Sequence, residues 1–166
     1  MSTASRTVAL VGGVGLLRPA PGTWGALVAL PLGWAVTVLG GPWALVAALV
    51  AVTLLGLWAV SEELRHSADP DPGEIVIDEV AGQWVALIPV VFGAASAGTG
   101  LLALWPGWVA AFLLFRLFDI WKPGPIGWAD RRGGAVGLML DDLLAGVAAA
   151  LGVAVLAGLY HGALAP

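Results

Sequence analysis

Long apolar segments alternate with short charged clusters along this chain. Uncharged segments cover residues 19–61, 80–115 and 143–166. A membrane-crossing helix needs about 20 apolar residues, so the last segment fits one crossing and each of the others fits a hairpin of two short helices. Turn-forming residues near the middle of both hairpins, at 40–42 and 96–100, support this division. The pattern therefore predicts five helices, at about 26–40, 43–61, 81–96, 101–118 and 142–163.

Composition makes a membrane protein the expected class. The 166 residues are 60% hydrophobic and 11% charged, whereas soluble domains are about 45–50% apolar and about 25% charged. We expect a single integral-membrane domain over residues 1–166, folded as an all-α polytopic membrane helical bundle. The absence of cysteine excludes disulfides, thiolate metal sites and a cysteine nucleophile. With 7 basic against 11 acidic residues and no basic stripe, the chain is not expected to bind nucleic acid.

The charged residues predict how the chain is oriented in the membrane. Arg6 and Arg18 form a first cluster, eight further charges lie between positions 62 and 79, and another eight lie between positions 116 and 142. Five crossings place every lysine and arginine on one side and the two chain ends on opposite sides. The positive-inside rule assigns the charged side to the cytoplasm. Most tryptophans then fall near helix ends, where they form an aromatic belt or, as the alternative, pack between helices.

The sequence Gly22-Thr23-Trp24-Gly25, just before the first predicted helix, is a candidate phosphate site. Glycines at a helix start leave backbone N–H groups accessible, and this arrangement favours an anion. We therefore expect Gly22, Thr23 and Gly25 to contact a substrate phosphate. The alternative is an ordinary turn in which Thr23 is the helix N-cap.

Two pairs of adjacent acids stand where apolar helices are expected to begin. Asp78 and Glu79 precede the third predicted helix, with Gly82 one turn beyond Asp78, and Asp141 and Asp142 open the fifth. Either pair alone could serve only to complement a helix dipole. Two pairs at one membrane surface could instead converge on a divalent cation, and their hard oxygen ligands suit Mg²⁺.

Two cations and an acid gather at the end of the fourth predicted helix. Arg116 and Asp119 are three residues apart and hence neighbours on a helix, while Lys122 precedes Pro123, where the helix should end. Arginine binds phosphate through two parallel hydrogen bonds, and lysine acts as a point charge. We expect Arg116 and Lys122 to hold a substrate phosphate, although Lys122 alone could simply extend toward the membrane surface.

Together these residues predict metal-assisted hydrolysis of a phosphate ester. The expected catalytic residues are Asp78, Glu79, Asp119, Asp141 and Asp142. The expected Mg²⁺ ligands are Asp78, Glu79, Asp119 and Asp142. Neither cysteine nor histidine stands near these motifs, so a metal-activated water is the expected nucleophile. An aspartyl phosphate on Asp78, Asp119, Asp141 or Asp142 is the alternative.

At these motifs the chain resembles the bacterial phosphatidylglycerophosphatase A family. The similarity covers about residues 19–150, and one departure is Ala26, which stands where the family usually has Ser or Thr. The matching residues are Gly22-Thr23-Trp24-Gly25 with Pro31, Asp78-Glu79-Val80-Ala81-Gly82, the run from Phe115 to Pro123 with Pro125-Ile126, and Gly137, Met139, Asp141-Asp142 and Ala145-Gly146.

The resemblance implies a mostly helical enzyme of the bacterial inner membrane, surrounded by membrane lipids, with its active site facing the cytoplasm. Such enzymes use Mg²⁺ to remove the terminal phosphate from phosphatidylglycerophosphate, which gives phosphatidylglycerol in phospholipid biosynthesis. Two other classes fit less well. A phosphatidyltransferase using CDP-linked substrates would carry an Asp-Gly…Ala-Arg…Gly…Asp…Asp pattern, which is absent here. A small transporter would place polar groups near the bilayer midplane.

Overall fold

The structure, a computed structural model, describes residues 2–69 and 72–163, and every regular element within these ranges is helical. Four helical stretches are long and apolar enough to cross a membrane, so the predicted all-α membrane bundle is confirmed. The elements, in chain order, are α1 (Thr3–Ala9), the 3₁₀ segment η1 (Val11–Leu16), α2 (Pro21–Leu64), α3 (Ile77–Ser96), the 3₁₀ segment η2 (Leu101–Leu104), α4 (Trp105–Trp121), α5 (Pro125–Asp130) and α6 (Gly134–Ala163).

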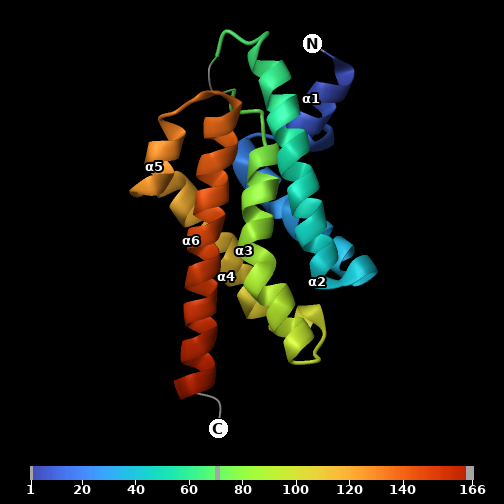
Figure 1. Cartoon of the computed structure of the whole chain (residues 1–166), viewed down its shortest axis with the longest axis vertical. Helices are drawn as coiled ribbons and strands as arrows, with labels where there is room; N and C mark the ends of the chain where they lie inside the picture. Colours follow the sequence, from blue (N-terminus) through green and yellow to red (C-terminus); the bar gives the residue numbers. More distant parts are fainter. Residues whose placement is uncertain (1, 70–71, 164–166) are drawn as a thin grey trace.

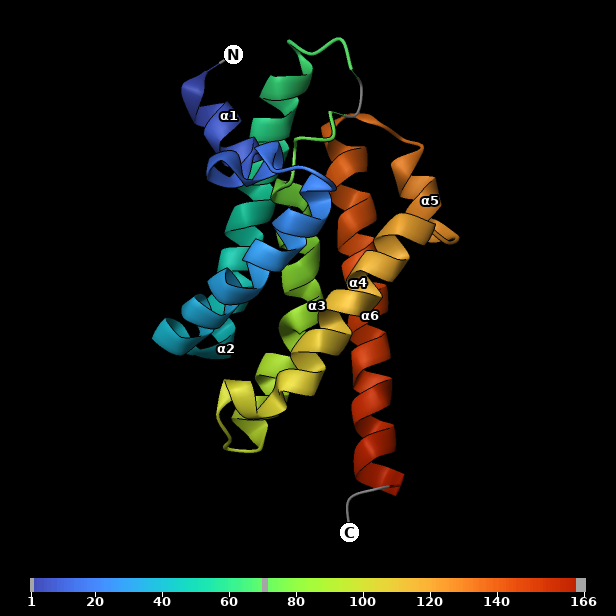
Figure 2. The same cartoon turned by 180° about the vertical axis from the view of Figure 1, so that it is seen from behind.

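Helix α2 is a hairpin of two helical arms. Gly41 has non-helical backbone angles, with φ at 77°, a conformation that glycine adopts without steric cost. The chain reverses direction there, so the first arm (residues 21–40) and the second arm (residues 42–64) run antiparallel (Figures 1 and 2). The turn predicted at 40–42 is therefore confirmed. Counted this way, α3, α4, α6 and the two arms give the five predicted helices.

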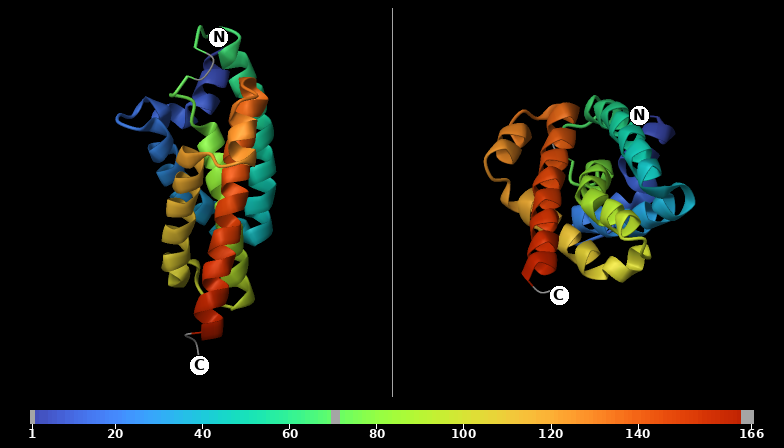
Figure 3. Two further views of the ribbon diagram at one scale, coloured as in Figure 1. Left: turned by 90° about the vertical axis from the view of Figure 1, so that its left-hand side faces the viewer. Right: turned by 60° about the horizontal axis from the view of Figure 1, so that its bottom comes forward.

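The charged clusters gather at one end of the bundle. Figure 1 places the N-terminus, the loop before α3 and the start of α6 at this end, which we call the polar end. The turn between α3 and α4 and the C-terminal end of α6 lie at the opposite, apolar end (Figure 3). The chain ends therefore lie at opposite ends of the bundle, as an odd number of crossings requires.

Three helices begin earlier than the charge pattern predicted. The first arm of α2 starts at Pro21 rather than at about 26. α3 starts at Ile77 rather than at about 81, and α6 starts at Gly134 rather than at about 142. Asp141 and Asp142 therefore lie two turns inside α6 and do not open it, which corrects the prediction. The prediction failed because it took charged residues as markers of helix ends, whereas these two side chains are buried inside the bundle. The expected loop after α4 also contains a short helix, α5.

Helix α3 is the centre of the bundle. It lies between α6 and the second arm of α2 and also packs on α4 (Figures 1 and 3). Its Trp84 is buried and donates a hydrogen bond from Nε1 to the carbonyl oxygen of Ala29, 2.8 Å away on the first arm of α2. Trp108 is also buried. For these two tryptophans the alternative of packing between helices is correct, and the aromatic belt is wrong.

Two glycines let α3 and α6 approach backbone to backbone. A Cβ atom added at Gly82 of α3 would lie 2.5 Å from the carbonyl oxygen of Asp142. One added at Gly146 of α6 would lie 2.3 Å from the carbonyl oxygen of Gly82. Any larger residue must therefore push the helices apart. This contact holds Asp142 opposite the first turns of α3.

We predict that Gly82→Ala and Gly146→Ala destabilise the protein, because overpacking a tight contact typically costs about 1–3 kcal/mol. Gly158→Ala is the matched control, since no atom lies within 4 Å of the added Cβ and alanine favours a helix over glycine. Thermal unfolding in detergent should show lower midpoints for the first two variants and an equal or higher midpoint for the control. Three equal midpoints would refute the backbone contact.

Candidate active site

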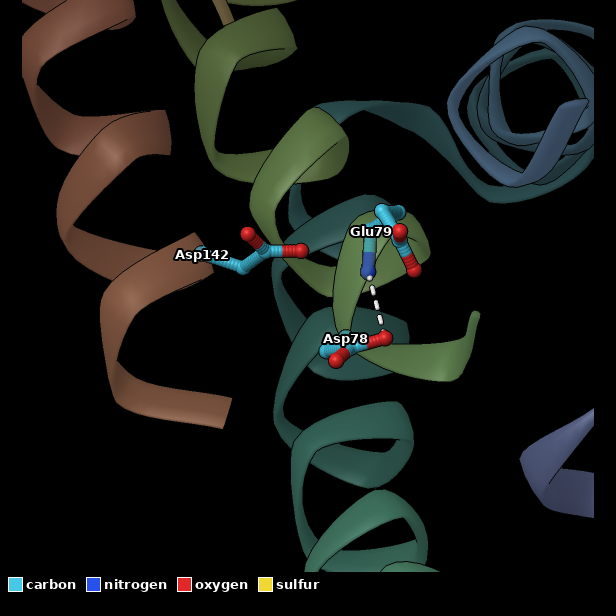
Figure 4. Close-up of side chains that lie close together, drawn as sticks. All are labelled: Asp78, Glu79 and Asp142. Atoms are coloured by element: carbon cyan, nitrogen blue, oxygen red, sulfur yellow. Dashed lines mark hydrogen bonds between the residues drawn. The ribbon is translucent and has the colours of Figure 1, made fainter. Parts of the chain in front are cut away.

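Three carboxylates from two helices converge near the polar end. Asp78 and Glu79 lie in the first turn of α3, and Asp142 projects toward them from α6 (Figure 4). One oxygen from each of these side chains lies within 4.8 Å of the others. We call Asp78, Glu79 and Asp142 the carboxylate cluster. The structure thus brings together one acid pair and one member of the other pair.

The carboxylate cluster is enclosed by protein. Asp78 is 6% exposed and Asp142 is 4% exposed, while Glu79 is half-buried. Asp78 Oδ1 accepts a hydrogen bond of 3.1 Å from the backbone N–H of Glu79 (Figure 4), whereas Glu79 Oε2 is buried without a partner among the described residues. Like charges this close repel one another, and burial removes the water that would screen them. A cation among the three oxygens would reduce the repulsion between the carboxylates and would replace the lost interactions with water.

Arg116 brings positive charge to the edge of the cluster. On α4, its Nη1 donates a hydrogen bond of 2.5 Å to Asp119 Oδ2, one turn further along the helix. Both side chains are largely buried, and Arg116 Nε has no partner among the described residues. Asp119 is not a member of the carboxylate cluster, although it interacts electrostatically with Asp142. The guanidinium group thus keeps free hydrogen-bonding capacity beside the acids.

The start of α2 reaches the same place. A Cβ atom added at Gly22 would lie 2.0 Å from Glu79 Oε1 and 3.3 Å from Arg116 Nη1. Gly22 is therefore needed where the first arm of α2 meets α3 and α4. The N-cap of α2 is Ala20, which supplies no side-chain hydrogen bond. Pro21 has no N–H, and the N–H groups of Thr23 and Trp24 donate to the carbonyl oxygen of Ala20, so the N–H of Gly22 is the group at this helix start that is left for an anion.

The other two residues of the predicted phosphate motif have different surroundings. Thr23 lies within the first turn of α2, so the alternative of Thr23 as the N-cap is wrong. Gly25 is buried, and a Cβ atom there would lie 2.9 Å from Cβ of Val76. Close packing of α2 on the start of α3 explains this glycine without a phosphate contact. Ala26 is fully buried as well, where a hydroxyl group would need a partner.

Lys122 is already paired with acids. It ends α4 in a left-handed backbone conformation, with φ at 49°, so the helix ends where Pro123 predicted. Its Nζ donates hydrogen bonds to Asp130 Oδ1 at 2.5 Å and to Asp141 Oδ2 at 2.6 Å. Burial lowers the pKa of Lys122, but its hydrogen bonds to Asp130 and Asp141 outweigh burial and raise the pKa above its ordinary value. Lys122 therefore stays charged, and two of its three N–H donors are already used.

Asp141 belongs with Lys122 rather than with the carboxylate cluster. The Asp141 side chain is 4% exposed, and its Oδ2 accepts the hydrogen bond from Lys122. Neighbouring positions on a helix point about 100° apart, so Asp141 and Asp142 face different partners. The predicted catalytic set thus separates into a cluster of three acids and two acids that pair with cations.

Gln83 is a candidate functional residue that the sequence reasoning missed. It is completely buried, and neither its amide nitrogen nor its amide oxygen has a hydrogen-bond partner among the described residues. Four residues after Glu79 on α3, it lies on the same helix face as that acid. An uncharged polar residue in an otherwise apolar helix, one turn beyond two acids, was the signal available in the sequence.

Comparison with known proteins gives consistent matches over most of the chain. A model of the phosphatidylglycerophosphatase A family matches residues 7–157. Phosphatidylglycerophosphatase A of Escherichia coli (strain K12) is 36% identical over 153 residues, which are 90% of this chain and 81% of that protein. Phosphatidylglycerophosphatase A of Haemophilus influenzae is 34% identical over 140 residues, which are 84% of this chain and 80% of that protein.

A third relative has a different name. A protein of Bacteroides thetaiotaomicron, whose name proposes a phosphatidylinositol-3-phosphatase, is 36% identical over 140 residues. These residues are 81% of this chain and 82% of that protein. No solved structure matches the chain significantly.

Proposed function

The chain belongs to the phosphatidylglycerophosphatase A family and is a phosphatase, and from this premise we propose that it converts phosphatidylglycerophosphate to phosphatidylglycerol. In this reaction a water oxygen bonds to the terminal phosphorus while the bond from phosphorus to the glycerol oxygen breaks. The products are phosphatidylglycerol, an intermediate or end product of phospholipid biosynthesis, and inorganic phosphate. Family membership sets aside the transferase and transporter alternatives.

One observation carries the proposal. The carboxylate cluster, the partly unpaired guanidinium group of Arg116 and the uncapped start of α2 at Gly22 meet at one point. A phosphate monoester needs this combination, since its oxygens require positive partners while its phosphorus requires an attacking oxygen.

The carboxylate cluster fits Mg²⁺ as its cofactor. Hard carboxylate oxygens are the ligands that Mg²⁺ takes from proteins, and the buried Glu79 Oε2 lacks any other partner among the described residues. Asp78, Glu79 and Asp142 would hold the ion, whereas Asp119, also expected as a ligand, is paired with Arg116. When bound, Mg²⁺ supplies charge neutralisation for the phosphate and lowers the pKa of water.

The remaining residues then have distinct roles. Arg116 holds two phosphate oxygens through its planar guanidinium group, and Asp119 positions that group. The N–H group of Gly22, at the positive end of α2, stabilises negative charge on the phosphate. Lys122 donates a hydrogen bond to Asp141, and the raised pKa of Lys122 makes this lysine a poor proton donor at neutral pH.

Water is the nucleophile that these contacts favour. Asp119 and Asp141 could otherwise form an aspartyl phosphate, but each accepts a hydrogen bond from a cationic side chain. Asp78 and Asp142, the other two candidates, belong to the proposed Mg²⁺ site. A carboxylate held in this way is a weaker nucleophile than a free one, because its negative charge is already stabilised.

The proposed location is the bacterial inner membrane, with the polar end facing the cytoplasm. Six of the seven lysines and arginines lie outside the apolar helices on that side, and Arg116 lies in the last two turns of α4 near the same end, in agreement with the positive-inside rule. The chain has no cysteine, so single cysteines at Ser67 and at Ala97 can report the orientation. A membrane-impermeant reagent added outside intact cells should label Ala97→Cys and leave Ser67→Cys unlabelled. The reverse pattern would invert the orientation.

The substrate proposal is tested with purified protein and two lipids. We expect rapid release of phosphate from phosphatidylglycerophosphate and much slower release from phosphatidylinositol 3-phosphate, in which a bulky ring carries the phosphate. Inorganic phosphate is measured over time in mixed micelles. Preference for the inositol lipid would assign the chain the activity that the name of the Bacteroides relative proposes.

The metal proposal predicts Mg²⁺ binding that depends on the carboxylate cluster. In isothermal titration calorimetry, Asp142→Asn should weaken binding at least tenfold, because it removes one of three anionic ligands. Glu62→Gln is the matched control, since Glu62 pairs with Arg65 outside the cluster. If the two variants bind Mg²⁺ with equal affinity, the ion binds outside the carboxylate cluster.

The phosphate contact predicts a severe defect in Arg116→Ala. Loss of one contact to developing charge typically costs about 2.7–4 kcal/mol, so kcat should fall roughly a hundredfold to a thousandfold. Arg116→Lys should recover only part of this loss, because lysine lacks the planar fork. Arg132→Ala is the control, since that exposed arginine lies over the ring of Trp128 at 4.0 Å and not in the site. Near-normal kcat in Arg116→Ala would show that another group holds the phosphate.

A further inference from the structure

The surface of the bundle contains an apolar cavity that is open along one side. It measures about 400 Å³ and lies between the first arm of α2 and α4. No charged side chain lines it. Its walls include Leu30, Pro31 and Trp34 on the first arm and Trp105, Trp108 and Val109 on α4.

The same two helices border the cavity and the site. Leu30 lies eight residues beyond Gly22 on the first arm, or about 12 Å along the helix axis. Val109 precedes Arg116 by seven residues on α4, or about 10 Å. Leu30 and Val109 both lie nearer to the apolar end than Gly22 and Arg116 do. Figure 2 shows the first arm of α2 and α4 on the same side of the bundle, on either side of α3. The cavity therefore lies deeper in the bilayer than the site.

Gln83 lies between the site and the cavity in depth. It is four residues beyond Glu79 on α3, or about 6 Å deeper along the helix. Successive helical residues turn by about 100°, so Gln83 points only about 40° away from Glu79, which itself meets Gly22 and Arg116. Its buried amide has no partner among the described residues, and an unpaired buried amide is costly unless a ligand or water completes it.

We propose that the acyl part of the substrate lipid occupies this cavity and that the amide of Gln83 binds its headgroup. The inference rests on the proposed function. The terminal phosphate then lies at Arg116, the amide of Gln83 donates to or accepts from the headgroup oxygens, and an acyl chain follows the apolar walls. From the polar end inward, the polar site is followed by Gln83 and then by the apolar cavity. A phospholipid that enters between the first arm of α2 and α4 presents its phosphate, its glycerol part and its acyl chains in the same order.

A second cavity cannot take this role. It measures about 200 Å³ and is lined by charged residues that include Arg6, Glu63 and Glu74. An acyl chain would leave those charges without water or partners. Of these two cavities, the apolar one between α2 and α4 is therefore the one suited to hydrocarbon.

The cysteine-free chain allows the cavity to be filled after folding. Val109→Cys is purified, assayed, then alkylated with the bulky reagent pyrenylmaleimide and assayed again. Substrates are phosphatidylglycerophosphates with dioleoyl or dihexanoyl chains. Alkylation should lower kcat/KM for the dioleoyl substrate at least tenfold more than for the dihexanoyl substrate. Leu151→Cys is the matched control, because Leu151 is 64% exposed on α6, and its alkylation should leave both values unchanged.

A second variant tests the amide. Gln83→Leu should raise KM for both substrates at least fivefold while thermal stability stays equal or rises, because the variant removes an unpaired buried polar group. Equal loss for the two chain lengths on alkylation at position 109, or no loss, would overturn the acyl site. An unchanged KM in Gln83→Leu would remove the headgroup contact. Failure of the unaltered enzyme to hydrolyse either substrate would instead refute the proposed function.

Discussion

The backbone contact between Gly82 of α3 and Asp142 of α6 is the constraint on which the rest of the structure depends. Two glycines, one on each helix, allow the carbonyl groups to approach closer than side chains would permit. This approach sets the rotation and depth of α6 relative to α3, and hence the position of the Asp142 side chain opposite Asp78 and Glu79. A site made of three acids from two separate helices requires such a fixed crossing.

The same contact brings buried acids close together, and cations from the surrounding helices compensate only part of their negative charge. Acids buried inside an apolar bundle are costly, because hydrocarbon supplies neither water nor counter-ions. α4 contributes Arg116 to the edge of the cluster, and Lys122 at its end neutralises Asp141. Among the described residues, no lysine or arginine forms an ion pair with the three acids of the cluster, although Arg116 interacts electrostatically with Glu79. This excess of negative charge is the physical argument for a divalent cation and an anionic substrate there.

Hydropathy predicted the helices well and the site less well. Uncharged intervals gave the five helical segments and the turn at Gly41, and Pro123 gave the end of α4. The starts of α3 and α6 were misplaced, since a buried acid inside a helix and a solvated acid at its end look alike in a sequence. The acids were all named, but only tertiary packing separates Asp142, which joins the carboxylate cluster, from Asp141, which pairs with Lys122. The phosphate contact of Gly25 stays a prediction, because a glycine needed for helix packing and one needed for phosphate binding look alike in a sequence.

We expect a single point between α2, α3, α4 and α6 to bind both metal and phosphate. Anomalous diffraction from crystals grown with Mn²⁺ and inorganic phosphate tests it most directly, since Mn²⁺ takes the same oxygen ligands as Mg²⁺. We predict one strong Mn²⁺ peak among the carboxylates of Asp78, Glu79 and Asp142, with phosphate density against Arg116 and the N–H group of Gly22. A Mn²⁺ peak at Glu63 and Glu74 instead, or phosphate bound away from Arg116, would contradict it.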